Sequence, residues 1–152
     1  MINAEVLVDT QNWKKIIKNP EVLISNTLKK FPKTFRFDNQ KVYISILLTT
    51  NKKIKLLNKK FRKKNKATDI LSFPFFDKKN MKKSLRKKEF YLGDIVISYE
   101  EFLRKNKKNY KDEFIKIFIH GFLHLLNFDH KSNKDHSIMS SKENKIFKKV
   151  KG

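Results

Sequence analysis

All four histidines of the chain lie close together near its C-terminal end, and three of them have the spacing of metal ligands. His120 and His124 are four residues apart, so on a helix they project from one face. Asn127 can end that helix in the left-handed conformation, so that the chain turns back and presents His130. Three neutral histidines with an open fourth position are typical of a catalytic zinc site. The alternative is a helix with two incidental histidines, but the other residues of 117–126 are apolar or glycine, which favours the metal site.

Two polar neighbours have predicted positions around these ligands. Asp129 can accept an N–H from a ligand histidine or orient the turn. His136 lies beyond the turn, and we interpret it as a surface residue that caps the last helix.

Gly121 separates this pattern from a group of zinc proteases with the same histidine spacing. Those enzymes carry a glutamate directly after the first histidine as a general base, and glycine cannot move a proton. Glycine inside a helix costs about 1 kcal/mol relative to alanine. We therefore expect either a strand to approach closely at Gly121 or a substrate backbone to need the space.

The segment 120–130, HGFLHLLNFDH, resembles the signature HGxLHLxGYDH of the YbeY family of metal-dependent endoribonucleases. Residues 57–74 and 92–98 agree with two further blocks of that family, in the same order. The chain departs from the pattern at Asn127, where glycine is usual, and at Phe128, where tyrosine is usual. Asparagine is the next-best residue for a left-handed turn, so the metal geometry is expected to survive. Any hydrogen bond of the tyrosine hydroxyl is lost.

The resemblance implies a single α+β domain over residues 1–152, with a small mixed β-sheet packed with helices. It implies one Zn²⁺ ion on His120, His124 and His130, held by a helix and the following turn. It further implies cleavage of single-stranded RNA, with ribosomal RNA and the ribosome as partners, in 3′-end maturation of 16S ribosomal RNA and in ribosome quality control. By position, Arg62 corresponds to the family's basic residue near the metal, which we interpret as catalytic.

Arg62 has an alternative interpretation as a solvated helix charge. Only four of the 37 basic residues are arginines, so an arginine at this motif position favours a need for its planar, two-pronged donor. In the predicted mechanism, zinc lowers the pKa of its water to about 7 and polarises a phosphoryl oxygen, while Arg62 neutralises charge on the phosphate. Whether a hydroxide or the RNA 2′-hydroxyl is the nucleophile stays open.

Two other functions also stay open. One is a metal-dependent hydrolase of another substrate such as a peptide, against which Gly121 and the positive charge of the chain both argue. The other is a ribosome-assembly factor whose metal site is mainly structural.

Composition is consistent with a small basic enzyme. The 152 residues are 39% hydrophobic, which is enough for one domain with a core. No apolar run reaches the ~18 residues of a membrane span, and the N-terminus lacks a secretory signal pattern. Because cysteine is absent, a disulfide scaffold and a thiol nucleophile are excluded. We therefore expect a cytoplasmic protein without membrane partners. The net charge of +22 favours a polyanion such as RNA, although part of it reflects a general bias towards lysine.

Hydrophobic periodicity predicts strands that alternate with helices, which is typical of an α+β or α/β domain. The predicted strands are 5–8, 42–48, 69–75 and 91–98. The predicted helices are 13–17 with a cap at Asp9 or Thr10, 22–30, a helix after the cap residue Thr50, 99–106, 112–127, and 134–150 with Ile138, Ile146 and Phe147 on its apolar face. Pro74 indicates that its strand lies at a sheet edge or ends there. Residues 77–89 are predicted to be a basic loop, either solvated or in contact with RNA.

Overall fold

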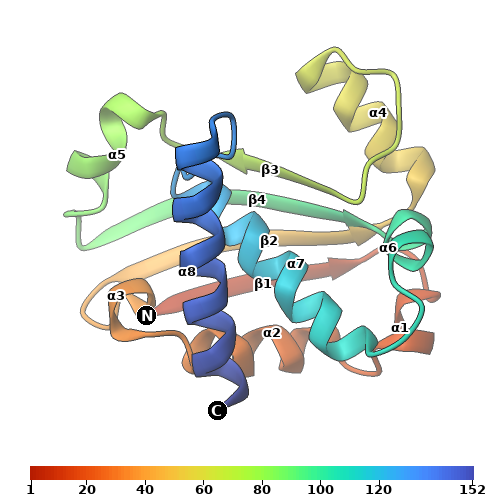
Figure 1. Cartoon of the computed structure of the whole chain (residues 1–152), viewed down its shortest axis with the longest axis horizontal. Coiled ribbons are helices and arrows are strands. Elements are labelled where there is room, and N and C mark those ends of the chain that lie inside the picture. Colours follow the sequence, from red (N-terminus) through yellow and green to blue (C-terminus); the bar gives the residue numbers. More distant parts are fainter.

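A four-stranded mixed sheet forms the centre of the computed structural model, which describes all residues from Met1 to Gly152 (Figure 1). In spatial order the strands are β1 (Ile2–Val8), β2 (Lys41–Thr49), β4 (Glu89–Ser98) and β3 (Ile70–Pro74). Strands β1, β2 and β4 run parallel, whereas β3 pairs antiparallel with β4 and forms one edge. The predicted edge position of Pro74 is confirmed.

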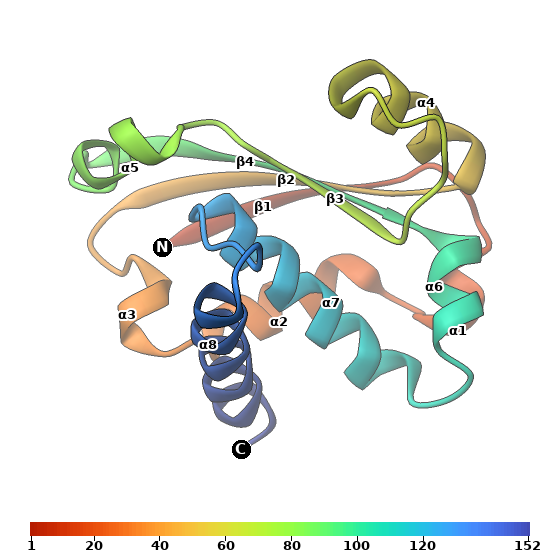
Figure 2. The ribbon, with the colours of Figure 1, turned by 45° about the horizontal axis from the view of Figure 1, so that its top comes forward.

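Most helices cover one face of this sheet, and one helix covers part of the other (Figure 2). The covered face carries α1 (Trp13–Ile16), α2 (Pro20–Lys29), α3 (Lys33–Arg36), α6 (Tyr99–Lys105), α7 (Tyr110–Leu125) and α8 (Asn133–Lys151). Helix α4 (Asn51–Arg62) packs on the opposite face, and α5 (Lys78–Ser84) lies at one end of the sheet. No helix is both long and apolar enough to span a membrane.

Alternation along the strands explains this layering. In β2, every second residue points towards the helices and is buried, namely Val42, Ile44, Ile46 and Leu48. These side chains join the large aromatic residues of α7 in one main core. A smaller cluster of Ile54, Leu71 and Val96 lies beneath α4 on the other face.

Several local predictions are confirmed. The hydroxyl of Thr50 accepts a hydrogen bond from the backbone N–H of Lys53 and so caps α4. The predicted strands correspond to β1–β4, with ends that differ by a few residues.

Other local predictions are wrong. Residues 77–89 contain α5, because the Asp77 carboxylate caps it at Asn80 and Met81 is buried in the core. Neither Asp9 nor Thr10 occupies the cap position of α1, and the Asp9 carboxylate instead accepts a hydrogen bond from the Thr49 hydroxyl. The short helix α3 has no predicted counterpart.

The start of α8 also differs from the prediction. Ser132 caps the helix by accepting from the N–H of Asp135, so His136 lies within the first turn and is not a cap. Its side chain is exposed, as predicted. On the apolar face, Met139 is buried, whereas Ile138 is 41% exposed.

Candidate metal centre

Helix α7 and the turn after it bring the three predicted histidines together. The Nε2 atoms of His120 and His124 are 3.1 Å apart, as expected for residues on adjacent turns of one helix face. Asn127 adopts the left-handed conformation with φ of 66°, and its side chain donates a hydrogen bond to the carbonyl of Phe76. The turn brings His130 back towards the other two histidines. One ring nitrogen from each of the three lies within 4.8 Å of the other two.

The chemistry of this donor set fits a metal ion. The pKa of His124 is lowered to about 4, mainly by burial and to a smaller extent by the neighbouring His120 and His130. Its imidazole is therefore neutral at pH 7 and keeps a lone pair that can bind a metal ion. In a tetrahedral zinc site, ligand nitrogens lie about 3.3 Å from one another, since each Zn–N bond is about 2.0–2.1 Å long. The 3.1 Å between Nε2 of His120 and Nε2 of His124 is already close to this spacing.

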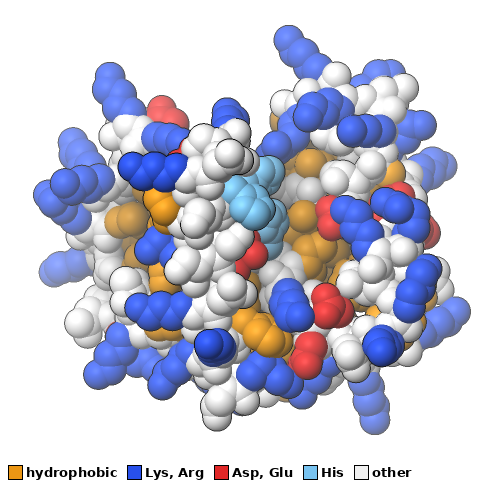
Figure 3. Space-filling view, in the orientation of Figure 1, with side chains coloured by type: hydrophobic (Ala, Val, Ile, Leu, Met, Phe, Trp, Pro, Cys, Tyr) orange, Lys and Arg blue, Asp and Glu red, His pale blue; other side chains and the backbone are white.

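The histidines open onto a cavity of about 530 Å³. Figure 3 shows histidine side chains at a hollow in the middle of the face that it draws, with lysine and arginine side chains spread around it. Four of the residues that line the cavity are basic, and we call them the cavity cations: Arg62, Lys64, Lys78 and Lys131. Three imidazoles beside an open cavity fit the pattern expected of a catalytic zinc site, since structural sites are closed by a fourth ligand.

The structure places Arg62 in the same cavity as the histidines. Arg62 is the last residue of α4, and its Nη2 donates to the carbonyl of Ser72 at 2.8 Å. Its guanidinium carbon lies 5.7 Å from the centre of the Phe73 ring. These two contacts with β3 hold the guanidinium at the cavity wall.

Gly121 allows β3 to approach α7 closely. A Cβ atom at this position would lie 2.7 Å from Cδ1 of Ile70 and 3.1 Å from Oγ of Ser72. The hydroxyl of Ser72 donates to the Gly121 carbonyl at 3.0 Å, which joins the strand to the helix directly beside His120. Of the two predicted explanations for this glycine, the close approach of a strand is confirmed.

Asp129 makes its hydrogen bond within the turn and none to a histidine ring. Its carboxylate accepts a hydrogen bond from the backbone N–H of His130 at 2.7 Å. The carboxylate that contacts a ligand imidazole belongs to Glu143 of α8, whose Oε1 lies 2.7 Å from Nδ1 of His120. Sequence reasoning missed Glu143. The signal that could have found it is a carboxylate in line with the buried residues Met139 and Ile146.

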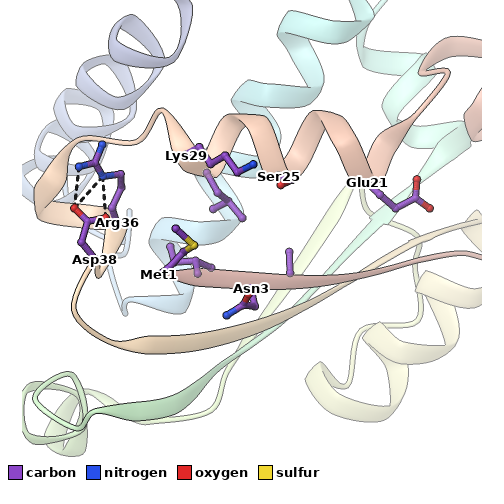
Figure 4. Close-up of a pocket in the computed structure, with 10 residues that line it drawn as sticks. Met1, Asn3, Glu21, Ser25, Lys29, Arg36 and Asp38 are labelled. Carbon is purple, nitrogen blue, oxygen red and sulfur yellow. Dashed lines mark hydrogen bonds and ion pairs between the residues drawn. The ribbon is translucent and has the colours of Figure 1, made fainter.

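A second cavity of about 400 Å³ lies between β1 and α2, away from all predicted site residues (Figure 4). Arg36 and Asp38 line it and pair with each other, with Nη2 2.8 Å from Oδ2. No histidine lines this cavity, so it lacks the donor set that lines the first cavity.

Comparison with known proteins identifies the family. The family model described as Endoribonuclease YbeY matches residues 7–151. The chain belongs to the YbeY family. A protein of Pelagibacter ubique named Endoribonuclease YbeY is 48% identical, over 99% of this chain and 97% of its own length. One of the same name from Caldicellulosiruptor bescii is 37% identical, over 92% of this chain and 88% of its own.

A solved structure shares the fold. The solution structure of a Thermotoga maritima protein aligns with 99% of this chain and 89% of its own, with a TM-score of 0.56 and 24% identity. The predicted membership in the YbeY family and the predicted α+β fold with a mixed sheet are therefore confirmed. The roles of Arg62 and of the three histidines remain predictions.

Proposed function

We propose that this chain is a zinc-dependent endoribonuclease specific for single-stranded RNA. We further propose that it acts in the cytoplasm, in 3′-end maturation of 16S ribosomal RNA and in ribosome quality control. Relatives named endoribonucleases support the reaction class. The observation that carries the proposal is the convergence of three imidazoles on a cavity that also holds the Arg62 guanidinium.

The residues of the site have separate tasks in this proposal. His120, His124 and His130 would hold the ion. When bound, zinc supplies Lewis acidity towards a phosphoryl oxygen and lowers the pKa of a coordinated water. Arg62 is fixed by the Ser72 carbonyl through one of its five N–H donors. The remaining donors can stabilise the negative charge that grows on the phosphate during cleavage, with no reorganisation at that moment.

In this proposal, the other cavity cations bind the RNA backbone on either side of the reacting phosphate. Lys64, Lys78 and Lys131 come from three different segments and line the same cavity as the histidines. A volume of about 530 Å³ is within the range of small-molecule sites and suits one nucleotide better than a base pair. Unpaired bases can be splayed into such a cavity, whereas paired bases cannot, and this supports the preference for single strands.

Peptide hydrolysis with a glutamate base does not fit this site. Position 121 carries no side chain, and a Cβ atom there would lie 2.7 Å from Cδ1 of Ile70, so that Ile70 would have to shift to admit one. A mainly structural metal site fits less well than a catalytic one, because the open cavity lies directly beside the ligands.

Cleavage of a labelled single-stranded RNA by the purified protein tests the proposal. We expect cutting that a chelator abolishes and added zinc restores, with much slower cutting of the same RNA in a duplex. The His124→Ala variant is the control for a contaminating nuclease and should be inactive. Cutting that persists in chelator, or equally in this variant, would show that the three histidines are not the catalytic metal site.

The product ends then identify the nucleophile. Attack by the 2′-hydroxyl must leave a 2′,3′-cyclic phosphate, whereas attack by water need not. An RNA with a 2′-deoxy substitution at the cleavage site distinguishes the two routes, since only the first requires that hydroxyl.

A further inference from the structure

Helix α8 carries a carboxylate where its pattern calls for an apolar residue. Met139, Ile146 and Val150 are buried and form the stripe that packs against the rest of the protein. Glu143 follows Met139 by four residues and precedes Ile146 by three, so it lies on that same stripe. Glu143 is partly buried at this position, so its carboxylate is stabilised by a hydrogen-bonding partner.

The partner of Glu143 is a predicted metal ligand. Oε1 of Glu143 lies 2.7 Å from Nδ1 of His120, a distance typical of a strong hydrogen bond. An ionised carboxylate has only acceptor oxygens, so this contact is a hydrogen bond when the neutral imidazole carries its proton on Nδ1. Nε2 of His120 then keeps its lone pair, and this is the atom that faces Nε2 of His124.

We propose that Glu143 is a positioning residue that fixes the tautomer and the ring orientation of His120 for metal binding. This inference rests on the metal centre of the proposed function. A carboxylate that accepts from the remote nitrogen of a ligand histidine orients the ring and makes it a better donor to the metal. Glu143 does so from a helix that supplies none of the three ligands.

A purely structural role is the alternative, in which the Glu143–His120 pair only attaches α8 to α7. In that case, loss of any α7–α8 contact should affect Zn²⁺ affinity to the same extent. Glu143 and His120 are 30% and 31% exposed, and both line a hollow of about 260 Å³ at the protein surface. A second ion pair joins the same two helices away from the metal centre, because Nζ of Lys151 lies 2.8 Å from Oδ1 of Asp112. Asp112→Ala therefore provides a matched control that removes an α7–α8 contact and leaves the site intact.

The experiment measures Zn²⁺ affinity by competition with a chromophoric chelator for the parent protein and for three variants. We expect Glu143→Ala to weaken binding about 10–100-fold, as loss of such a partner typically does. Glu143→Gln should recover much of the loss, since its amide oxygen can still accept from Nδ1. Asp112→Ala should leave the affinity unchanged within about twofold, whatever its effect on thermal unfolding.

Three results would overturn the inference. The first is a Glu143→Ala variant that binds Zn²⁺ as tightly as the parent, and the second is an Asp112→Ala variant that loses as much affinity. The third comes from imidazole ¹⁵N NMR of the metal-free parent, which needs no variant to fold: a proton on Nε2 of His120 in place of Nδ1. Failure of the proposed metal centre looks different, because then the parent itself binds no Zn²⁺.

Discussion

Replacing Arg62 with lysine separates catalysis from binding and from stability. Lysine keeps the positive charge but loses the planar donor that the Ser72 carbonyl and the Phe73 ring hold in place. Loss of a preorganised donor of this kind slows turnover by about 10²–10³, equivalent to about 2.7–4 kcal/mol in the transition state. The cost in folding should be smaller, about 0.5–1.5 kcal/mol, because the exposed side chain makes one hydrogen bond to the protein.

The assay for this prediction uses single-turnover cleavage at saturating enzyme, together with binding of an uncleavable RNA analogue. We expect the Arg62→Lys rate to fall by the stated factor while RNA affinity changes by less than about threefold. Arg104→Lys is the matched control, because Arg104 lies on α6 outside the cavity and pairs with Glu101. If Arg62→Lys cuts at the parent rate, Arg62 is an ordinary surface charge and the catalytic role is wrong.

Three further predictions concern the metal, the charge and the sheet. His124→Ala should leave two ligands and lose most bound zinc, so a full equivalent of zinc found by metal analysis would contradict the three-histidine site. The logarithm of RNA affinity should fall as the logarithm of salt concentration rises, by about 0.7 for each phosphate that is neutralised. If all four cavity cations contact phosphates, the slope should be about −3. A flat dependence in a binding titration would refute that contact. Gly93→Ala should destabilise the protein by about 2–6 kcal/mol in chemical denaturation, because φ is 146° and the new Cβ would lie 2.3 Å from the Phe73 carbonyl oxygen. Parent-like stability would contradict this account of the β3–β4 contact.

The parts of the site that the sequence predicted depend on local rules of helix, turn and strand formation. The pair His120 and His124 follows from helix periodicity, and the return of His130 follows from a residue suited to the left-handed conformation at Asn127. Likewise, the run 42–48 predicts β2 because its apolar and β-branched residues suit a buried strand.

The parts that sequence missed depend on contacts between distant segments. Residues 77–89 contain a helix because Met81 fits into a core formed by other elements, and nothing within the segment shows that core. Glu143 contacts His120 across 23 positions and from a different helix, so no short motif contains both. The contact of Arg62 with Ser72 likewise depends on how α4 and β3 are placed relative to each other.

Ser72 connects the two halves of the site, and the register of β3 makes this possible. Its hydroxyl donates to the carbonyl of Gly121, the neighbour of His120, and its own carbonyl accepts from Arg62. Pairing of Ser72 with Ile95 on β4 directs the hydroxyl towards α7. Because neighbouring strand residues point to opposite faces, a slip of one residue would turn Phe73 towards α7 and remove that contact. The edge strand β3 therefore sets the position of Arg62 relative to the three histidines.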